Sequence, residues 1–176
     1  RATSTVWVTP QFAIGDQIGV ADLAQLRAAG FAADINARPA ADGGTYPTSA
    51  EAQSAAAAQD LAYAHCPTEN HAIFETDIID RFELALTDLP KPIFAHCKSG
   101  TRAAILWGLV AARHRPVEEV IAALQAAGQD LEFLADELRA AAAAPRGSLL
   151  QLKEDALLNL GQSRLIRSPP GRDPAT

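Results

Sequence analysis

The sequence has only two cysteines, Cys66 and Cys97, among 176 residues, and it contains no methionine. Two cysteines are too few for a disulfide-stapled scaffold, so they are expected to be thiols in a reducing compartment. No hydrophobic run approaches the roughly 20 residues that a membrane-spanning helix needs. The first residues lack the apolar stretch and cleavage pattern of a signal peptide. We therefore expect a cytoplasmic protein without a membrane anchor.

Positive charge is also scarce. Lysine and arginine number 15 against 21 aspartates and glutamates, which gives a formal net charge of −6. Binding to nucleic acid or to an anionic membrane requires dense positive charge, so neither partner is expected. The length, with 48% hydrophobic residues, is suited to one globular domain that buries a sizeable core.

Strand-like and helix-like patterns alternate along the chain. Extended patterns cover residues 5–9, 12–14, 31–36, 61–66 and 92–96, and helical patterns cover 21–29, 52–58, 77–86, 102–113, 117–127, 131–144 and 149–160. The first two strands predict a hairpin at a sheet edge. The alternation predicts an α/β fold in which helices flank a mostly parallel central sheet, with functional loops at the carboxyl ends of its strands.

The patterns also suggest three regions. Residues 1–131 are expected to form the catalytic domain, and 132–160 a helical extension that packs on it or mediates association with another subunit. Its leucine-rich second half makes a homo-oligomer or a bound partner conceivable. Residues 161–176 are rich in proline and poor in apolar side chains, so a disordered tail is expected there.

The most informative segment is the strand that ends at His96 and runs through a loop into an apolar helix. The loop reads Cys97-Lys98-Ser99-Gly100-Thr101-Arg102. Its backbone N–H groups and the start of the helix can together bind an anion. The same positive field favours the thiolate form of Cys97, which predicts a reactive nucleophile.

Each remaining loop residue has an expected task. Gly100 suits a tight turn with positive φ, and the planar guanidinium of Arg102 can hold two oxygens of an anion. Lys98 adds a point charge, and Ser99 or Thr101 offers a hydroxyl to Cys97. A lone cysteine at a strand end is more often a small buried hydrophobe. Gly100 and Arg102 at these spacings favour the functional interpretation.

Four segments of the chain resemble the phosphatase domain family of bacterial beta-lactamase hydrolase-like proteins, which is also described as a sulfurtransferase family. They are 15–18 (GDQI), 35–39 (INARP), 64–67 (AHCP) and 96–102 (HCKSGTR). The resemblance covers about residues 6–131. It implies a fold like that of dual-specificity phosphatases, with Cys97 and Arg102 in the catalytic positions.

The loop length separates two activities. Cysteine-based phosphatases typically have five residues between the cysteine and the arginine, whereas this chain has four. The shorter loop resembles that of rhodanese-type sulfurtransferases. Our leading hypothesis is therefore that Cys97 takes sulfur from a small donor, holds it as a persulfide and passes it to a thiol acceptor. The alternative is a protein phosphatase of the tyrosine or dual-specificity type, which acts on a phosphorylated substrate through a Cys97 phosphocysteine. A further alternative is a non-catalytic, anion-sensing module that binds a partner.

A phosphatase needs an acid that protonates the leaving group. The loop after residue 66 contains no aspartate, so Glu69, His71 or the more distant Asp77 would have to act. Cys66 is a candidate resolving thiol, because we expect its strand to neighbour that of Cys97, although a buried core thiol is the more common case.

Supporting roles are expected for two further residues. His96 is expected to order the loop through a hydrogen bond of its ring, and Arg38 either lines the same cleft or forms a surface ion pair. Adjacent strand residues point to opposite faces, so the two His-Cys pairs do not suggest a shared metal site. Neither a metal nor another cofactor is expected.

Overall fold

The structure, a computed structural model, describes residues 4–40, 44 and 46–144. Its elements, in chain order, are β1 (Val6–Thr9), β2 (Phe12–Gly15), α1 (Asp22–Ala28), β3 (Ala33–Asn36), α2 (Ser49–Ala58), β4 (Ala62–His65), η2 (Asn70–Ala72), α3 (Thr76–Asp88), β5 (Ile93–His96), α4 (Thr101–Ala111), α5 (Val117–Ala126), η3 (Glu132–Leu134) and α6 (Ala135–Ala143). Strands and helices alternate as the sequence predicts, with boundaries shifted by a few residues.

The five strands form one sheet in the order β1-β2-β5-β3-β4. β1 and β2 form the predicted antiparallel hairpin at one edge, and the other neighbouring strands run parallel. The prediction of an α/β fold with a mostly parallel sheet is therefore confirmed. One detail of the expected order is wrong, because β3 lies between β4 and β5 and these two strands are not neighbours.

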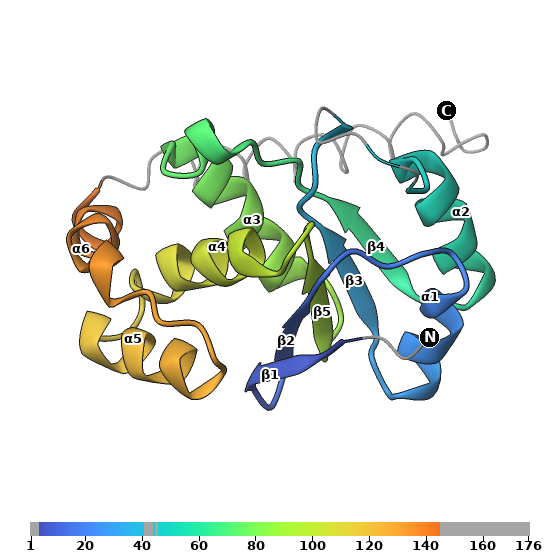
Figure 1. Ribbon diagram of the computed structural model, residues 1–176, viewed down its shortest axis with the longest axis horizontal. Helices are drawn as coiled ribbons and strands as arrows, with labels where there is room; N and C mark the ends of the chain where they lie inside the picture. The colour runs from blue at the N-terminus through green and yellow to red at the C-terminus, as the bar shows by residue number, and fades with distance from the viewer. Residues whose placement is uncertain (1–3, 41–43, 45, 145–176) are drawn as a thin grey trace, which may run out of the picture.

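Helices cover both faces of the sheet (Figure 1). Alternation along β5 assigns its side chains to the two faces, since Ile93, Ala95 and Cys97 join the larger core cluster and Phe94 joins the smaller one. The larger cluster lies under α3, α4, α5 and α6, whereas α1 and α2 cover the smaller one. The nucleophile candidate, Cys97, therefore lies directly after β5 and within the main core.

α4 is apolar around most of its circumference because it is packed on several sides. It contacts the sheet, α3, α5 and α6. Gly108 allows the close packing of α5 and α6, because a Cβ atom there would lie 3.1 Å from Leu124 and 3.4 Å from Leu138. α4 thus connects the loop that begins at Cys97 to the centre of the molecule.

The first residues of the expected helical extension pack on the core of the preceding residues. Leu131, Leu134 and Leu138 belong to the same buried cluster as the residues of α4. The single helix expected over 131–144 begins instead as the short 3₁₀ turn η3, followed by α6. The expected helix at 149–160 and the expected tail at 161–176 lie outside the described residues.

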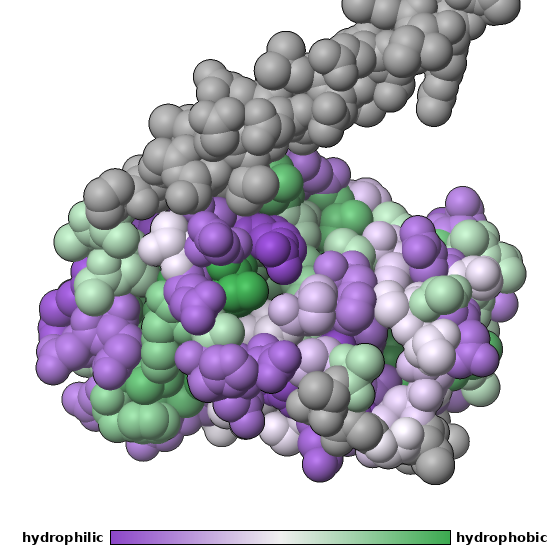
Figure 2. All heavy atoms as spheres, turned by 90° about the horizontal axis from the view of Figure 1, so that it is seen from above, coloured by the Kyte–Doolittle hydropathy of each residue, from purple (hydrophilic) through white to green (hydrophobic). Residues whose placement is uncertain are grey.

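Among the described residues, no helix is both long enough and apolar enough to cross a membrane. The carboxyl ends of β2, β3, β4 and β5 lie together at the top of Figure 1. Figure 2 looks down on this end of the molecule, where hydrophilic residues surround a small hydrophobic area. Loops at this end of a parallel sheet are where ligands bind in open α/β folds.

Candidate active site

The segment that runs from the end of β5 into the first turn of α4, which we call the Cys97 loop (residues 97–102), has the geometry of an anion-binding turn. Cys97 follows the last residue of β5 and is fully buried. Its Sγ atom accepts a hydrogen bond from the backbone N–H of Gly100, with 3.1 Å between nitrogen and sulfur. The loop therefore curls around the sulfur with a backbone N–H directed at it, an arrangement that also suits an anion held beside the sulfur.

Gly100 is required by the turn. It has φ of 97° and lies immediately before α4, in the left-handed region that favours glycine. A Cβ atom at Gly100 would also lie 3.4 Å from the carbonyl oxygen of Gly15, at the end of β2. The conformation of the Cys97 loop thus depends on a backbone that approaches a neighbouring strand closely.

Arg102 lies in the first turn of α4 and is largely buried. Its Nη1 donates a hydrogen bond of 2.9 Å to the carbonyl oxygen of Thr68, in the segment that follows β4. Thr68 is itself buried and its N–H donates to the carbonyl oxygen of Ala37, after β3. Arg102 therefore joins the Cys97 loop to the ends of two other strands.

His96 points to the face of the sheet opposite Cys97. Its Nδ1 lies 2.9 Å from Oδ1 of Asp34, a β3 residue, and both side chains are buried. The sequence predicts that the His96 ring bonds the loop, whereas its recorded partner is this strand carboxylate. His96 therefore positions the Cys97 loop through its contact with β3, on the face of the sheet opposite Cys97, and not through a bond to the loop itself.

The hydroxyls of Ser99 and Thr101 do not contact the Cys97 sulfur in the way expected for them. Lys98, Ser99 and Thr101 are exposed. The Ser99 hydroxyl donates to the Thr101 hydroxyl at 3.3 Å, whereas the hydrogen bond to the Cys97 sulfur comes from the backbone of Gly100. The backbone carbonyl of Lys98 accepts a 3.3 Å hydrogen bond from the N–H of Gln17, which attaches the loop to the segment after β2.

Arg38 is buried at the end of β3 and does not lie on the surface. Its Nη1 donates to Oε1 of Gln17 at 3.1 Å, and its guanidinium carbon lies 3.9 Å from the centre of the Tyr46 ring. The Asn36 side chain accepts a hydrogen bond from the Arg38 N–H. These contacts hold Arg38 in one place beside the strand end that borders the Cys97 loop.

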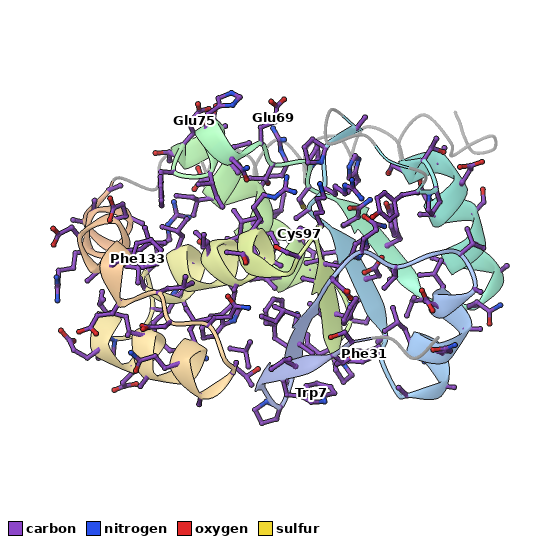
Figure 3. All side chains as sticks on the ribbon, viewed as in Figure 1. Trp7, Phe31, Glu69, Glu75, Cys97 and Phe133 are labelled. Carbon is purple, nitrogen blue, oxygen red and sulfur yellow. The ribbon has the colours of Figure 1, made fainter. Side chains whose placement is uncertain are left out.

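The candidate acids lie on the same side of the molecule as the loop, but they are exposed. Glu69 follows Thr68, the residue that Arg102 holds, and its carboxylate is 3.7 Å from Nδ1 of His71. Figure 3 shows Glu69 above Cys97, with its side chain directed away from the sulfur. Asp77 is exposed in the first turn of α3. Among these three residues, only Glu69 adjoins a group bonded to Arg102.

Cys66 lies too far from Cys97 for a direct bond in this arrangement. Both cysteines are free and buried, and β3 separates their strands by two spacings of about 4.8 Å, whereas disulfides need Cα atoms within about 7 Å. Burial raises the pKa of the Cys66 thiol to about 11, although Arg81 opposes the shift. Cys66 is therefore a protonated core thiol at neutral pH, and its expected position beside the Cys97 strand is wrong.

Three residues that sequence reasoning missed complete the surroundings: Asp34, Gln17 and Thr68. A charged residue within the apolar run 31–36 was a visible signal for Asp34, whereas Thr68 acts through its backbone carbonyl. Within the described part of the chain, no three His, Cys, Asp or Glu side chains gather as a metal site would require. The chemistry of the arrangement is that of a thiol beside an anion-binding loop.

Comparison with known proteins agrees with this geometry. Residues 5–114 match the family model described as the phosphatase-like domain of beta-lactamase hydrolase-like protein. A relative of that name from Agrobacterium fabrum is 36% identical over 104 residues, or 59% of this chain and 24% of the relative. One from Xylella fastidiosa is 32% identical over 102 residues, or 58% of this chain and 23% of the relative. The matched region thus spans about a quarter of these relatives.

Solved structures give the same result. A candidate phosphatase from Neisseria meningitidis has a TM-score of 0.67 and 27% identity, over 77% of this chain and 96% of that one. The catalytic domain of a PP-IP phosphatase from Saccharomyces cerevisiae has a TM-score of 0.61 at 10% identity, over 89% and 94%. The fold is therefore that of cysteine-based phosphatases, and none of these matches supports the sulfurtransferase interpretation. The chain belongs to the family of phosphatase-like domains found in beta-lactamase hydrolase-like proteins.

Proposed function

We propose that the protein hydrolyses phosphate monoesters, with Cys97 as the nucleophile. The observation that carries the proposal is the buried Cys97 sulfur, which accepts the Gly100 N–H inside a loop that leads into α4. The phosphatase-like family and the cysteine-phosphatase fold support the same reaction class.

The reaction proceeds in two steps. In the first, the Cys97 thiolate attacks phosphorus, the ester P–O bond breaks, and the leaving oxygen takes a proton as it departs. In the second, water attacks the phosphocysteine and the P–S bond breaks, which releases inorganic phosphate and regenerates the thiolate. Backbone N–H groups of the Cys97 loop and the guanidinium of Arg102 bind the phosphoryl oxygens and stabilise the charge that develops on them.

The hydrogen bond between Arg102 and Thr68 positions the proposed acid for the first step. The hydrogen bond attaches the segment after β4 to the Cys97 loop. Glu69 is the residue after Thr68, so its backbone is held close to the loop. Glu69 is our proposed general acid. Since its side chain points away from the sulfur here, it must rotate toward the leaving oxygen when substrate is bound.

Phosphate release from 4-nitrophenyl phosphate tests the proposal. We expect Cys97→Ser to abolish release, and Arg102→Lys to reduce it strongly, because lysine keeps the charge without the two-pronged guanidinium. Cys66→Ser is the matched control and should keep most of the activity, since that thiol is protonated and two strands away. Release that persists in Cys97→Ser would disprove the proposed mechanism.

Sulfur transfer is the second candidate function, and one specific observation favours it. Four residues separate Cys97 from Arg102, and this short loop offers fewer inward N–H groups than a tetrahedral phosphoryl group normally receives. In that reaction the thiolate attacks the outer sulfur of thiosulfate, sulfite leaves, and a Cys97 persulfide remains. A Cys97-dependent mass gain of one sulfur atom, without phosphate release, would favour this function over the first.

A further inference from the structure

Asp34 is a buried carboxylate that the reaction proposed above does not use. It lies in β3 on the face of the sheet opposite Cys97, between Tyr63 of β4 and Phe94 of β5, which are its partners in register. Among the described residues, its ion-pair partner is the His96 ring, with 2.9 Å between Oδ1 and Nδ1. A carboxylate inside an apolar core needs a balancing positive charge, so an imidazolium ring is the form of His96 that stabilises Asp34 best.

Among the described residues, few other groups near this pair titrate. Residues from the loop after β2, from α1, from β3 and from α2 line a small cavity beside the pair, and Asp34 and His96 are the titratable groups among those described. Asp22 of α1 accepts the N–H of Gly19 at 2.9 Å. Tyr63 is the titratable neighbour on β4, and burial raises its pKa, so its hydroxyl stays neutral at physiological pH. The charge at this place therefore depends on the pair itself.

The positive member of the pair is the one nearer to the nucleophile. His96 directly precedes Cys97, whereas Asp34 lies in register with Phe94, two residues earlier on β5 than His96. The His96 carbonyl also accepts the N–H of Ala37 at 2.8 Å, which holds the end of β5 against β3. A positive charge that lies closer than its counter-charge stabilises the negative charge of a thiolate and of a bound phosphoryl group.

We propose that Asp34 is a positioning residue of the phosphatase reaction, which keeps the His96 ring charged and in place so that Cys97 is held as a reactive thiolate. The inference rests on the proposed function, but it concerns the thiol before any substrate binds. Asp34 itself touches neither the substrate nor the sulfur, because its side chain lies on the other face of the sheet. An uncharged partner could hold the ring equally well through a hydrogen bond, so the effect of charge can be separated from that of position.

Alkylation of Cys97 by iodoacetamide makes this separation. Asp34→Asn keeps an oxygen that accepts the Nδ1–H of His96 but removes the carboxylate charge. We expect the rate at which the Cys97 sulfur displaces iodide, followed by mass spectrometry of its peptide, to fall about threefold or more at pH 6. At pH 9.5, where most thiols are ionised, the rate should change by less than about twofold. Equal rates at pH 6 would overturn the proposal, because a purely structural contact is retained by the amide.

Tyr63→Phe is the matched control, because it alters the other side of Asp34 without changing a charge. The Tyr63 hydroxyl contacts Asn36 at 3.0 Å and Ser49 at 3.1 Å, and these bonds are lost in the variant. The alkylation rates should stay as in the unmodified protein. A loss at pH 6 as large as that of Asp34→Asn would assign the effect to packing and overturn the role of the charge.

Nitrogen-15 NMR of the unmodified protein gives a second measurement, which applies even if Asp34→Asn fails to fold. At pH 8 an ordinary histidine, with a pKa near 6.5, is neutral. We expect both ring nitrogens of His96 to be protonated at that pH, and a neutral His96 ring would overturn the proposal. Neither measurement needs turnover, so a protein that releases no phosphate would refute the proposed function and leave this test of Asp34 intact.

Discussion

Residues of the strands next to the Cys97 loop position it as much as the residues of the loop do. Asp34 is fully buried in β3, and only one of its carboxylate oxygens has a hydrogen-bond partner among the described residues, namely Nδ1 of His96. Burial of a carboxylate is unfavourable unless it is paired, so this contact is a strong local requirement. The contact also fixes the position of His96, which directly precedes Cys97.

We predict that Asp34→Ala lowers the free energy of unfolding by about 1–3 kcal/mol, because the His96 ring loses its partner inside the core. Asp34→Asn retains an acceptor and should cost less. Urea denaturation measures both changes. Asp88→Ala removes an exposed carboxylate and is expected to stay within about 0.5 kcal/mol of the unmodified protein. An Asp34→Ala variant as stable as this control would show that the buried pair is not needed.

At the scale of elements, the segment from β4 to α3 belongs to the site as much as the Cys97 loop does. Thr68 is fixed through three contacts: its N–H donates to Ala37, its hydroxyl donates to the Cys66 carbonyl, and its own carbonyl accepts from Arg102. The 3₁₀ turn η2 begins two residues later. This segment combines an attachment point held by three hydrogen bonds with an exposed carboxylate, Glu69, which we propose as the acid.

We predict that Glu69→Gln slows hydrolysis of alkyl phosphates by 10² to 10⁴ while 4-nitrophenyl phosphate is affected little, because only a poor leaving group needs the proton. Steady-state kinetics with the two substrates measures the difference. His71→Asn and Asp77→Asn are the comparison variants, and both should behave like the unmodified protein. If either of them, rather than Glu69→Gln, shows the leaving-group dependence, the acid has been assigned to the wrong residue.

At the scale of the whole molecule, a buried ionic cluster joins α3 to the end of α4. Arg113 lies 2.8 Å from both Asp80 and Glu83, and His114 lies 2.7 Å from the second oxygen of Glu83. Burial alone would raise the pKa of Glu83, but the hydrogen bonds from Arg113 and His114 outweigh it and lower the pKa. The far end of the helix that carries Arg102 is thereby attached to the rest of the core.

The lowered pKa of Glu83 makes the stability of the fold dependent on pH. The unfolded state binds a proton first as pH falls, so the contribution of Glu83 is complete above its unfolded pKa of about 4.3 and is lost toward the lower folded pKa. We predict that Glu83→Gln lowers the free energy of unfolding at pH 7 by about 1.5–3 kcal/mol. The difference should shrink as pH falls below about 4.3, as measured by denaturation across pH.

Glu137→Gln, at an exposed position on α6, is the control for this series and should leave the pH dependence unchanged. A difference between Glu83→Gln and the unmodified protein that stays constant from pH 7 to 3.5 would contradict the assignment of the pH effect to this carboxylate.

Much of the fold and part of the site follow from sequence patterns. The period of apolar residues marks strands and helices, and the edge hairpin and parallel sheet follow from their order. The Cys97 loop can be predicted from sequence for a related reason. Cys97, Gly100 and Arg102 lie within six consecutive residues, so the local sequence of a strand, a turn and a helix start is enough to bring them together. The sequence by itself therefore determined the nucleophile candidate and its anion-binding turn.

Tertiary structure decided what surrounds that turn. The partner of His96 lies 62 residues away in sequence, that of Arg102 lies 34 away, and that of Arg38 lies 21 away. The expected closeness of Cys66 to Cys97 was wrong because β3 inserts between their strands. The period of apolar residues along a strand indicates which of its faces is buried. It does not give the order of the strands, because that order depends on how helices pack across the whole sheet. For that reason the Cys97 loop can be recognised in the sequence, whereas the contacts that hold it exist only in the folded molecule.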